Sequence, residues 1–340
     1  MDPLSHAVTG AALAQSAARR KEVVAATVVG VLAGMFPDVD IFIRSETDPL
    51  LNIEYHRQFT HALIMVPVFA LLLSGALHLF VRRWLSFGRS YLFSFLALLH
   101  HGILDAMTSY GTHLFWPFTD RRESWSIVAV VDPLYTLPIL LLVIVGLLRR
   151  SPVPARIALL FAAAFLSLGA LQTHRAKLAG YELAASRGHE PVRLEAKPTV
   201  FNNILFRLIY ETDDRFYVDA VRVNWWGNTM VYEGASTDRL SVEEARQGIP
   251  EDSPQYTDIQ RFAFFSDDYL YLPSGLNGTI GDLRYALLPD SLEPLWVIEL
   301  NPERPEGHVD YRVARDFGET ELERFRRMLL GDRNLDQNTE

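Results

Sequence analysis

The sequence has no cysteine among its 340 residues. This absence excludes disulfide bonds, cysteine zinc ribbons and thiol nucleophiles, so any metal ion must be held by histidine, aspartate or glutamate. It does not decide the compartment, because a cysteine-free chain suits the bacterial periplasm as well as the cytoplasm. A concentrated positive charge is also missing: the net charge is −9, and the acidic excess lies in the second half. We therefore expect no nucleic-acid partner.

Long apolar segments are scarce too, although 49% of the residues are hydrophobic. Only residues 61–81 form an uncharged run that reaches the roughly 20 residues of a full membrane-spanning helix. Five shorter uncharged runs cover residues 4–18, 23–37, 90–104, 133–148 and 157–173. Short runs still span a bilayer when polar residues at their ends lie in the interface or line a protected cavity. The first 173 residues therefore predict an α-helical membrane bundle of about six short helices.

Arginine and lysine residues divide these runs into two sides. They cluster in alternate connections, at residues 19–21, 82–89 and 149–156. In an up-and-down bundle such connections face the same side, and the positive-inside rule makes that side cytoplasmic. The N-terminus and everything after residue 173 would then lie outside the cytoplasm. A secretory signal peptide is not expected, since the charged residues follow the first apolar run.

The second half of the chain has a different pattern. Residues 174–197 predict a polar helical linker, and residues 198–340 predict a soluble, mainly β (α+β) extracytoplasmic domain with a helix at 319–330. Short β-branched and aromatic runs bounded by turn residues indicate its strands. These runs cover residues 215–226, 229–236, 260–273, 282–289 and 295–300. The domain carries no recognisable catalytic constellation, and we interpret it as a lid or a substrate selector.

Histidines and aspartates gather at the helix ends opposite the arginine clusters. With one arginine, the set is His6, Asp38, Asp40, His56, Arg57, His61, His100, His101, Asp105 and Asp132. Ionisable groups at a membrane edge are costly and tend to be functional. Each alone has an ordinary explanation, as when an aspartate before a proline caps a helix. Together, imidazole and carboxylate groups suit Zn²⁺, Mn²⁺ or Fe²⁺, and their number allows one ion or two.

The local spacing within this set supports a shared site. His101 and Asp105 are four residues apart and therefore share a helix face. Asp38 and Asp40 follow Pro37 in an expected non-helical turn, which can aim both carboxylates at one ion. Arg57 is either an interfacial anchor or a group that stabilises anionic charge on a phosphate, and we favour the second interpretation.

Five stretches, in order, resemble a known family. They read "DPLSHAVTGAALA", "FPDVDIF", "HRQFTHAL", "HHGILDAMTSYGTHLFWPF" and "VDPLYTLP". This order is similar to the membrane-bound metal-dependent hydrolases of bacteria, the YdjM-like proteins, closely over residues 1–140 and loosely beyond. The resemblance implies a location in the bacterial inner membrane and a distant relation to zinc-dependent phospholipases C. The metal ligands that it implies are His6, Asp38, Asp40, His56, His61, His101 and Asp105. His100 stands where the family has an apolar residue, which leaves open which histidine of the pair binds.

These observations predict a membrane-bound metal-dependent hydrolase. A metal, most suitably zinc, would lower the pKa of a bound water towards ~7. Asp40 or Asp105 would accept its proton, and Arg57 would stabilise the developing negative charge. The expected substrate is a phosphoester of a lipid or lipid-linked molecule, followed by a lipid ester or amide, met at the outer interface of the lipid membrane.

Two other classes of protein remain open at this stage. A metal-ion transporter also uses buried Asp and His, although here the polar residues lie at one end of the bundle. A structural or sensor protein would use a metal to tie helix ends together. A metal closed off by protein ligands would favour the structural class, whereas an open coordination position would favour hydrolysis. The sequence does not predict the oligomeric state.

Overall fold

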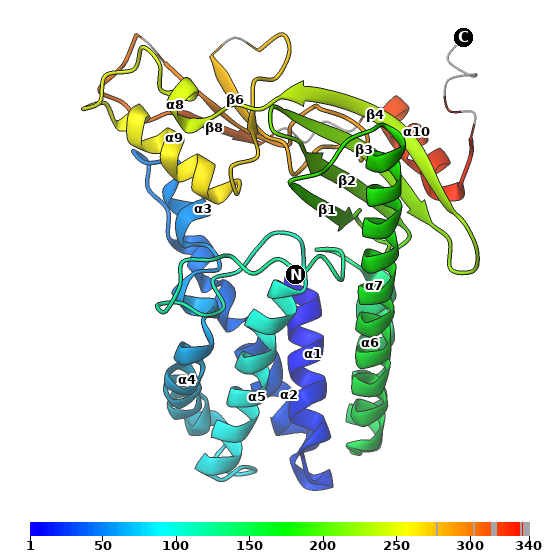
Figure 1. Cartoon of the computed structure of the whole chain (residues 1–340). Helices are drawn as coiled ribbons and strands as arrows, with labels where there is room; N and C mark the ends of the chain where they lie inside the picture. The colour runs from blue at the N-terminus through cyan, green and yellow to red at the C-terminus, as the bar shows by residue number, and fades with distance from the viewer. Residues whose placement is uncertain (277, 302, 314–317, 334, 336–340) are drawn as a thin grey trace. The chain divides into compact units, whose positions relative to one another are not determined.

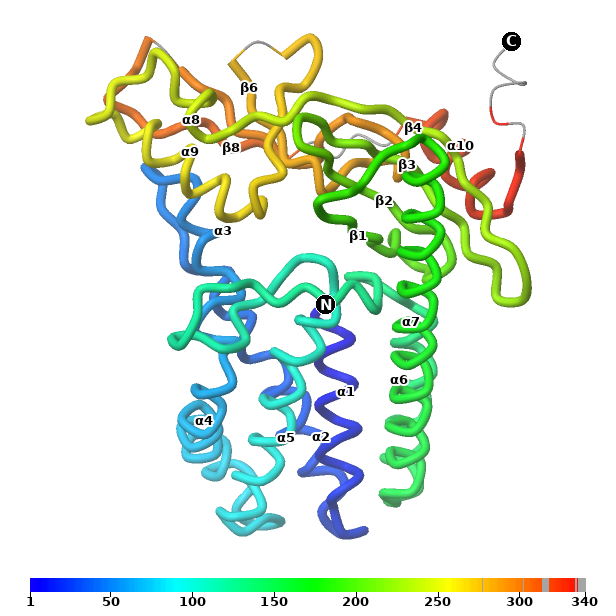
Figure 2. The backbone as a smooth tube through the Cα atoms, viewed as in Figure 1, coloured from blue at the N-terminus to red at the C-terminus, as the bar shows by residue number. Residues whose placement is uncertain are grey.

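The structure is a computed structural model that describes all residues except 277, 302, 314–317, 334 and 336–340. It divides into two compact units, which Figures 1 and 2 show as ribbon and tube. Unit 1 comprises Met1–Ile43, Tyr55–Leu171 and Val200–Asn203. Unit 2 comprises Arg44–Glu54, Gln172–Thr199 and Ile204–Glu340. Each unit therefore includes one short segment from within the other's main stretch of sequence.

Unit 1 is helical. Its helices are α1 (Pro3–Ser16), α2 (Val23–Met35), α4 (Val66–Val81), α5 (Phe87–Ala106), α6 (Pro133–Arg149) and the first part of α7 (Val153–Ser186). In the described part of the chain, three helical stretches are long and apolar enough to cross a membrane, namely Arg20–Phe42, Leu63–Val81 and Val153–Ser186. The sequence alone indicated one full-length run, because 3₁₀ turns extend α2 at both ends and α7 continues beyond its apolar part.

Small residues let α1 and α2 pack closely. A Cβ atom at Gly34 of α2 would lie 2.6 Å from the carbonyl oxygen of His6, and one at Gly30 would lie 2.5 Å from that of Gly10. Glycines four residues apart allow this approach of two helix backbones, a common device in membranes. The packing brings His6 next to the 3₁₀ segment η2 (Phe36–Phe42), which directly follows α2.

A second close contact joins α5 to the loop before α4. A Cβ atom at Gly102 would lie 2.2 Å from the carbonyl oxygen of His61, so only glycine fits there. His61 ends the short 3₁₀ turn η3 (Phe59–His61), and η4 (Leu63–Met65) leads on into α4. Asp132 lies apart from these contacts and caps α6, accepting a hydrogen bond from the Leu134 amide at 3.0 Å.

Unit 2 contains two antiparallel sheets. The first has the order β1-β2-β3-β4 and the second the order β5-β6-β7-β8. Their strands are β1 (Arg193–Pro198), β2 (Leu205–Glu211), β3 (Arg215–Val223), β4 (Thr229–Asp238), β5 (Leu270–Tyr271), β6 (Thr279–Asp282), β7 (Trp296–Glu299) and β8 (Asp310–Val313). The helices of this unit are α8 (Val242–Ala245), α9 (Pro254–Phe265) and α10 (Glu319–Leu330), with most of the short α3 (Leu51–Tyr55).

The predicted secondary structure of this half is partly wrong. The linker predicted over 174–197 is helical only to Ser186, and β1 begins at Arg193. The strand predicted over 260–273 begins as helix, since α9 runs to Phe265. The C-terminal helix Glu319–Leu330 lies where it was predicted. The aromatic run "RFAFF" suits either structure locally, and the Ser253 cap with Pro254 at the helix start favours the helix.

The C-terminal part of α7 packs against the first sheet. Ala176, Ala179 and Ala184 are buried against Phe206 and Leu208 of β2 in one apolar cluster. Alanines on this helix face let the sheet approach closely, which fixes the first sheet on the end of α7.

Candidate metal centre

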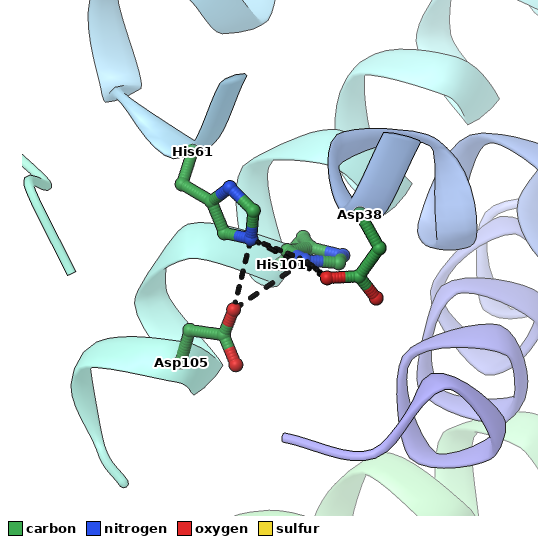
Figure 3. Close-up of side chains that lie close together, drawn as sticks. All are labelled: Asp38, His61, His101 and Asp105. Atoms are coloured by element: carbon green, nitrogen blue, oxygen red, sulfur yellow. Dashed lines mark hydrogen bonds and ion pairs between the residues drawn. The ribbon is translucent and has the colours of Figure 1, made fainter. Parts of the chain in front are cut away.

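Four side chains from three separate segments of unit 1 converge in one group. They are Asp38 from η2, His61 from η3, and His101 and Asp105 from α5. Figure 3 shows the two imidazole rings and the two carboxylates directed at a common point. The spacing of four residues within α5 puts its two side chains on one face, as the sequence predicted. The close approach of Gly102 to His61 brings the η3 histidine to the same place.

The facing atoms have the spacing of a metal-ligand set. Nε2 of His61 lies 3.0 Å from Nε2 of His101 and 3.0 Å from Oδ2 of Asp105. Oδ1 of Asp38 lies 3.6 and 3.5 Å from the same two nitrogens, and His101 Nε2 lies 3.5 Å from Asp105 Oδ2. With metal–ligand bonds of about 2.0–2.1 Å, the edges of a tetrahedron measure about 3.3–3.4 Å. Five of the six distances among the four atoms are therefore close to those of a tetrahedral site, and all four atoms lie within 4.8 Å of one another.

The outer nitrogen of each ring explains why the inner one faces the centre. His101 Nδ1 donates to the carbonyl oxygen of Gly34 at 2.6 Å, because a carbonyl can only accept. His61 Nδ1 lies 2.9 Å from the Thr60 hydroxyl, which itself donates to Asp40 at 2.7 Å and so accepts from the ring. In neutral rings both Nε2 atoms then carry lone pairs, which is the form that binds metals.

Four acceptor atoms that face one another require a cation. Two lone-pair nitrogens at 3.0 Å repel unless a proton or a metal lies between them. The second oxygen of Asp38 is buried and has no hydrogen-bond partner among the described residues. Two carboxylates and two neutral imidazoles also balance the charge of a divalent ion. The donor set therefore fits a divalent metal, and Zn²⁺, Mn²⁺ and Fe²⁺ suit these ligand types.

The electrostatics of His61, which precedes the membrane-type stretch Leu63–Val81, agree with this interpretation. Burial lowers the pKa of its ring, but hydrogen bonds to Asp105, Asp38 and Asp40 outweigh burial and raise the pKa to about 10. The raised pKa means that the site favours a positive charge at this ring, which a proton or a metal ion would supply. Metal binding would release this proton, as is usual for such ligands.

Asp40 and His56 lie behind the group of four and are not part of it. Asp40 accepts hydrogen bonds from His56 Nδ1 at 2.7 Å and from the Arg57 amide at 2.9 Å, in addition to the Thr60 hydroxyl. Burial lowers the pKa of His56, with Asp40 opposing and the Arg57 charge adding to the effect. In this arrangement Asp40 fixes the loop and the tautomer of His61. The family resemblance implied both residues as ligands, and the group of four contains neither of them.

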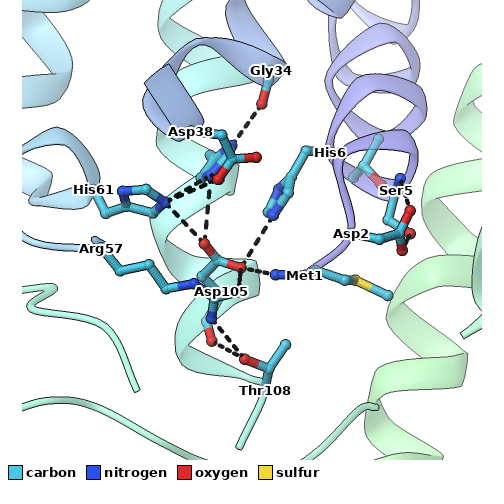
Figure 4. A network of polar contacts seen from close by, with 12 residues as sticks. Met1, Asp2, Ser5, His6, Gly34, Asp38, Arg57, His61, Asp105 and Thr108 are labelled. Atoms are coloured by element: carbon cyan, nitrogen blue, oxygen red, sulfur yellow. Dashed lines mark hydrogen bonds and ion pairs between the residues drawn. The ribbon is translucent and has the colours of Figure 1, made fainter. Parts of the chain in front are cut away.

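His6 and Arg57 approach the centre from the other oxygen of Asp105. His6 Nε2 and Arg57 Nη2 lie 3.1 and 3.2 Å from Asp105 Oδ1, which the amino group of Met1 also contacts (Figure 4). The His6 ring stacks on His101 with centroids 3.6 Å apart. Of the predicted ligands, the three histidines His6, His61 and His101 contact Asp105 directly. Asp38 and Asp40 reach the site through His61.

Arg57 is a buried residue of the site. Its side chain is 5% exposed, its Nη1 donates to Thr108 at 3.0 Å, and its guanidinium carbon lies 4.8 Å over the ring of Tyr110. A backbone φ of 64° turns the chain at this residue. These contacts differ from those of an interfacial anchor, whose charged end would extend into water. Sequence reasoning did not identify Thr60 or Thr108, since a lone threonine in a polar loop carries no distinguishing pattern.

Of the two adjacent histidines, His101 belongs to the group and His100 does not. The rings of His100 and His101 are 6.4 Å apart, and both ring nitrogens of His100 are buried without a hydrogen-bond partner among the described residues. Adjacent helical residues point about 100° apart, which explains why only one of them can face the centre.

Unit 2 has a second histidine and carboxylate group that the sequence did not reveal. Asp48, Asp258 and His308 come close together, but Arg261 already occupies this place. Its guanidinium pairs with Asp48 at 2.9 Å, Asp258 at 2.9 Å and Glu54 at 2.7 Å. This Arg261 cluster is an ion-pair network, and its carboxylates already have their cation.

The helical unit combines stretches that are long and apolar enough to cross a membrane with a donor set that could bind a metal ion. The YdjM inner membrane protein family matches residues 1–176, which is more than half of the chain, and the chain belongs to that family. The resemblance noted in the sequence is thereby confirmed.

Two curated proteins resemble the chain over about a third of its length. It is 33% identical over 108 residues to inner membrane protein YbcI of Escherichia coli (strain K12), and 28% identical over 109 residues to uncharacterized protein YfhP of Bacillus subtilis (strain 168). These matches cover 30% and 32% of this chain. They cover 60% and 33% of the relatives, so the chain spans less than two thirds of either. No solved structure gives a significant match.

Proposed function

We propose that this chain is a membrane-bound metal-dependent hydrolase that uses the group of Asp38, His61, His101 and Asp105. The observation that carries the proposal is the meeting of two imidazole nitrogens and two carboxylate oxygens beside a buried arginine. A divalent metal would supply Lewis-acid chemistry at this point. The substrate class is a phosphoester of a lipid or lipid-linked molecule, and the guanidinium of Arg57 is the group suited to its anionic oxygens.

The residues around the centre divide the remaining work. The Nδ1 atoms of His101 and His61 donate to the Gly34 carbonyl and the Thr60 hydroxyl. In neutral rings the Nε2 atoms therefore present lone pairs to the centre without rearrangement. Asp38 has the most exposed side chain of the four, at 16% compared with 0% for the others, and so marks the side open to water and substrate. The buried second oxygen of Asp38 has no hydrogen-bond partner among the described residues and is a further suitable proton acceptor, in addition to the Asp40 and Asp105 expected from sequence.

The proposal includes a membrane topology. The arginine clusters at alternate connections favour six helix crossings with their ends at 19–21, 82–89 and 149–156 in the cytoplasm. The histidines and aspartates would then lie at the outer interface of the inner membrane, and unit 2 would be extracytoplasmic. A centre at headgroup depth suits a lipid substrate.

A structural metal site is the second candidate, and one observation favours it. Four protein ligands complete a tetrahedral shell, whereas catalytic zinc sites keep a position for water. Hydrolysis would then require a fifth position, or release of one carboxylate, on the Asp38 side.

The deciding experiment combines metal exchange with a lipid assay. Detergent-purified protein is stripped of metal, reloaded with Zn²⁺ or Mn²⁺, and tested for cleavage of phospholipid headgroups. Wild type is compared with His101→Ala, and His78→Ala is the control because His78 lies outside the group and contacts Ser90. Cleavage that needs metal, disappears in His101→Ala and persists in His78→Ala would support hydrolysis. Stoichiometric metal without cleavage of any phosphoester, ester or amide lipid would instead support the structural role.

A further inference from the structure

The turn between β3 and β4 exposes two adjacent tryptophans. It has the sequence "NWWGN", residues 224–228, and Trp225 and Trp226 are 41% and 94% exposed. A nearly bare indole ring on a soluble surface gives up the burial that normally stabilises it. A nearly bare Trp226 next to a partly exposed Trp225 at the tip of a hairpin therefore indicates a surface that meets something apolar.

Three hydrogen bonds join α7 to the turn and to the adjacent end of β3. Arg175 donates from Nη1 to the carbonyl of Asn224 and from Nη2 to that of Gly227, both at 2.8 Å. Gln172 donates to the carbonyl of Val223 at 3.1 Å. The two donors lie three residues apart on one helix face, so a single turn of α7 bonds the end of the hairpin.

That turn of α7 lies where a membrane-spanning helix would leave the hydrocarbon. Helix α7 is continuous over 34 residues and is one of the three candidate spans. From Val153 to Gln172 it includes about 20 residues, which at about 1.5 Å each cover the roughly 30 Å of the bilayer core. Within this stretch Leu160 and Leu171 are 72% and 53% exposed, as lipid-facing side chains are. Gln172 and Arg175 then begin the polar boundary.

We propose that Trp225 and Trp226 form an interfacial anchor that inserts into the headgroup region of the bilayer spanned by α7. Tryptophan favours this depth, because the ring contacts acyl chains while its N–H reaches headgroups and water. Since the tip is bonded to α7 and the first sheet packs on the same helix, the anchor would fix the height of that sheet above the membrane. This inference does not depend on the metal or on hydrolysis.

The absence of cysteine allows a direct test with single spin labels on the full chain. Trp226→Cys is labelled at the tip, and Asp213→Cys is the matched control at the other end of β3. Asp213 is exposed, and the nine residues of β3 separate the two sites by about 30 Å. Both proteins are reconstituted into phosphatidylcholine vesicles. Collisions of each label with lipid-soluble oxygen and with a water-soluble nickel complex are measured by electron paramagnetic resonance.

We expect the ratio of oxygen to nickel accessibility to be several-fold higher at position 226 than at position 213. Equal, water-like ratios at both positions would overturn the proposal. Strong dipolar broadening at position 226 would also overturn it, since the occupant would then be a second copy of the chain. As an independent readout, phosphatidylcholine with brominated acyl chains should quench the tryptophan fluorescence of the wild-type protein more than that of Trp226→Phe. Equal quenching of the two proteins would contradict the anchor.

Discussion

The group of four in unit 1 and the Arg261 cluster in unit 2 contain the same kinds of side chain but differ in what lies between them. In the Arg261 cluster, a guanidinium donates to each of three carboxylates at 2.7 to 2.9 Å. In the group of four, Arg57 reaches only the outer oxygen of Asp105, and the facing atoms have no Lys or Arg partner among the described residues. A carboxylate and histidine cluster is thus a metal candidate when its acceptors lack a cation of the chain's own.

The largest expected effect is loss of metal from the group of four. Asp38→Asn keeps the shape of the side chain but removes the charge and replaces one oxygen with an amide. Asp38 contacts only His61 and His101 among the ion pairs described, so folding should persist. We expect affinity for Zn²⁺ or Mn²⁺ to fall by more than about 100-fold, beyond the usual cost of altering a supporting residue.

Chelator competition measures this change, with Asp258→Asn as the matched control in the Arg261 cluster. The control should keep its metal, because Asp258 bonds Arg261 and His308 in unit 2. Equal loss of metal in both variants would mean that the comparison between the two clusters is wrong.

The next effect concerns stability and should appear only in the Arg261 cluster. Arg261→Met leaves Asp48, Glu54 and the buried Asp258 without their cation. Uncompensated charge should destabilise the protein by about 2 kcal/mol, discounted from the fully buried case because Arg261 is partly exposed. Thermal unfolding in detergent measures the loss. Arg326→Met, which removes an exposed pair with Glu323, should leave the transition unchanged.

The content of the metal centre was more predictable than its internal arrangement. The spacing of His101 and Asp105 on one helix face predicted two of the four residues. The positions of Asp38 and His61 at the ends of apolar runs predicted the other two. The sequence did not distinguish Asp38, which faces the centre, from Asp40, which faces His56. That difference depends on the η2 turn and on the amide of Arg57, which are tertiary features. The Arg261 cluster stayed hidden because Arg261 lies more than 200 residues from its partners Asp48 and Glu54.

The two units also differ in how well the sequence predicts their fold. Uncharged runs predict the helices of unit 1 well, because burial in lipid or protein leaves a continuous apolar signal. Unit 2 was harder: β2 is buried at every position and lacks alternation, so the strand pattern was weak. The assignment of Arg44–Glu54 to unit 2 has no sequence signature, although Asp48 and Glu54 of this segment pair with the distant Arg261.

A smaller effect should separate support from ligation within the metal centre. Thr60→Val keeps the size of the side chain but removes the hydroxyl that donates to Asp40 and accepts from His61. His61 keeps its contact with Asp40 at 3.3 Å, so the correct tautomer is weakened rather than lost. We expect metal affinity to fall about tenfold, the lower end of the range for supporting residues. Loss as large as in Asp38→Asn would give Thr60 a more direct role, and an unchanged affinity would remove it from the site.

The smallest effect is a pH dependence that belongs to the Arg261 cluster. Burial raises the pKa of Asp48, but hydrogen bonds and charge from Arg261 outweigh it and hold the pKa below its ordinary value of 3.8. A lowered pKa in the folded protein gives stability that is present above pH 3.8 and is lost as the pH falls through the folded value. The stability difference between wild type and Arg261→Met should therefore be constant near pH 7 and shrink below about pH 4. Unfolding curves of both proteins across this range test it, and a difference that grows on acidification would show that Arg261 acts through packing and not through these carboxylates.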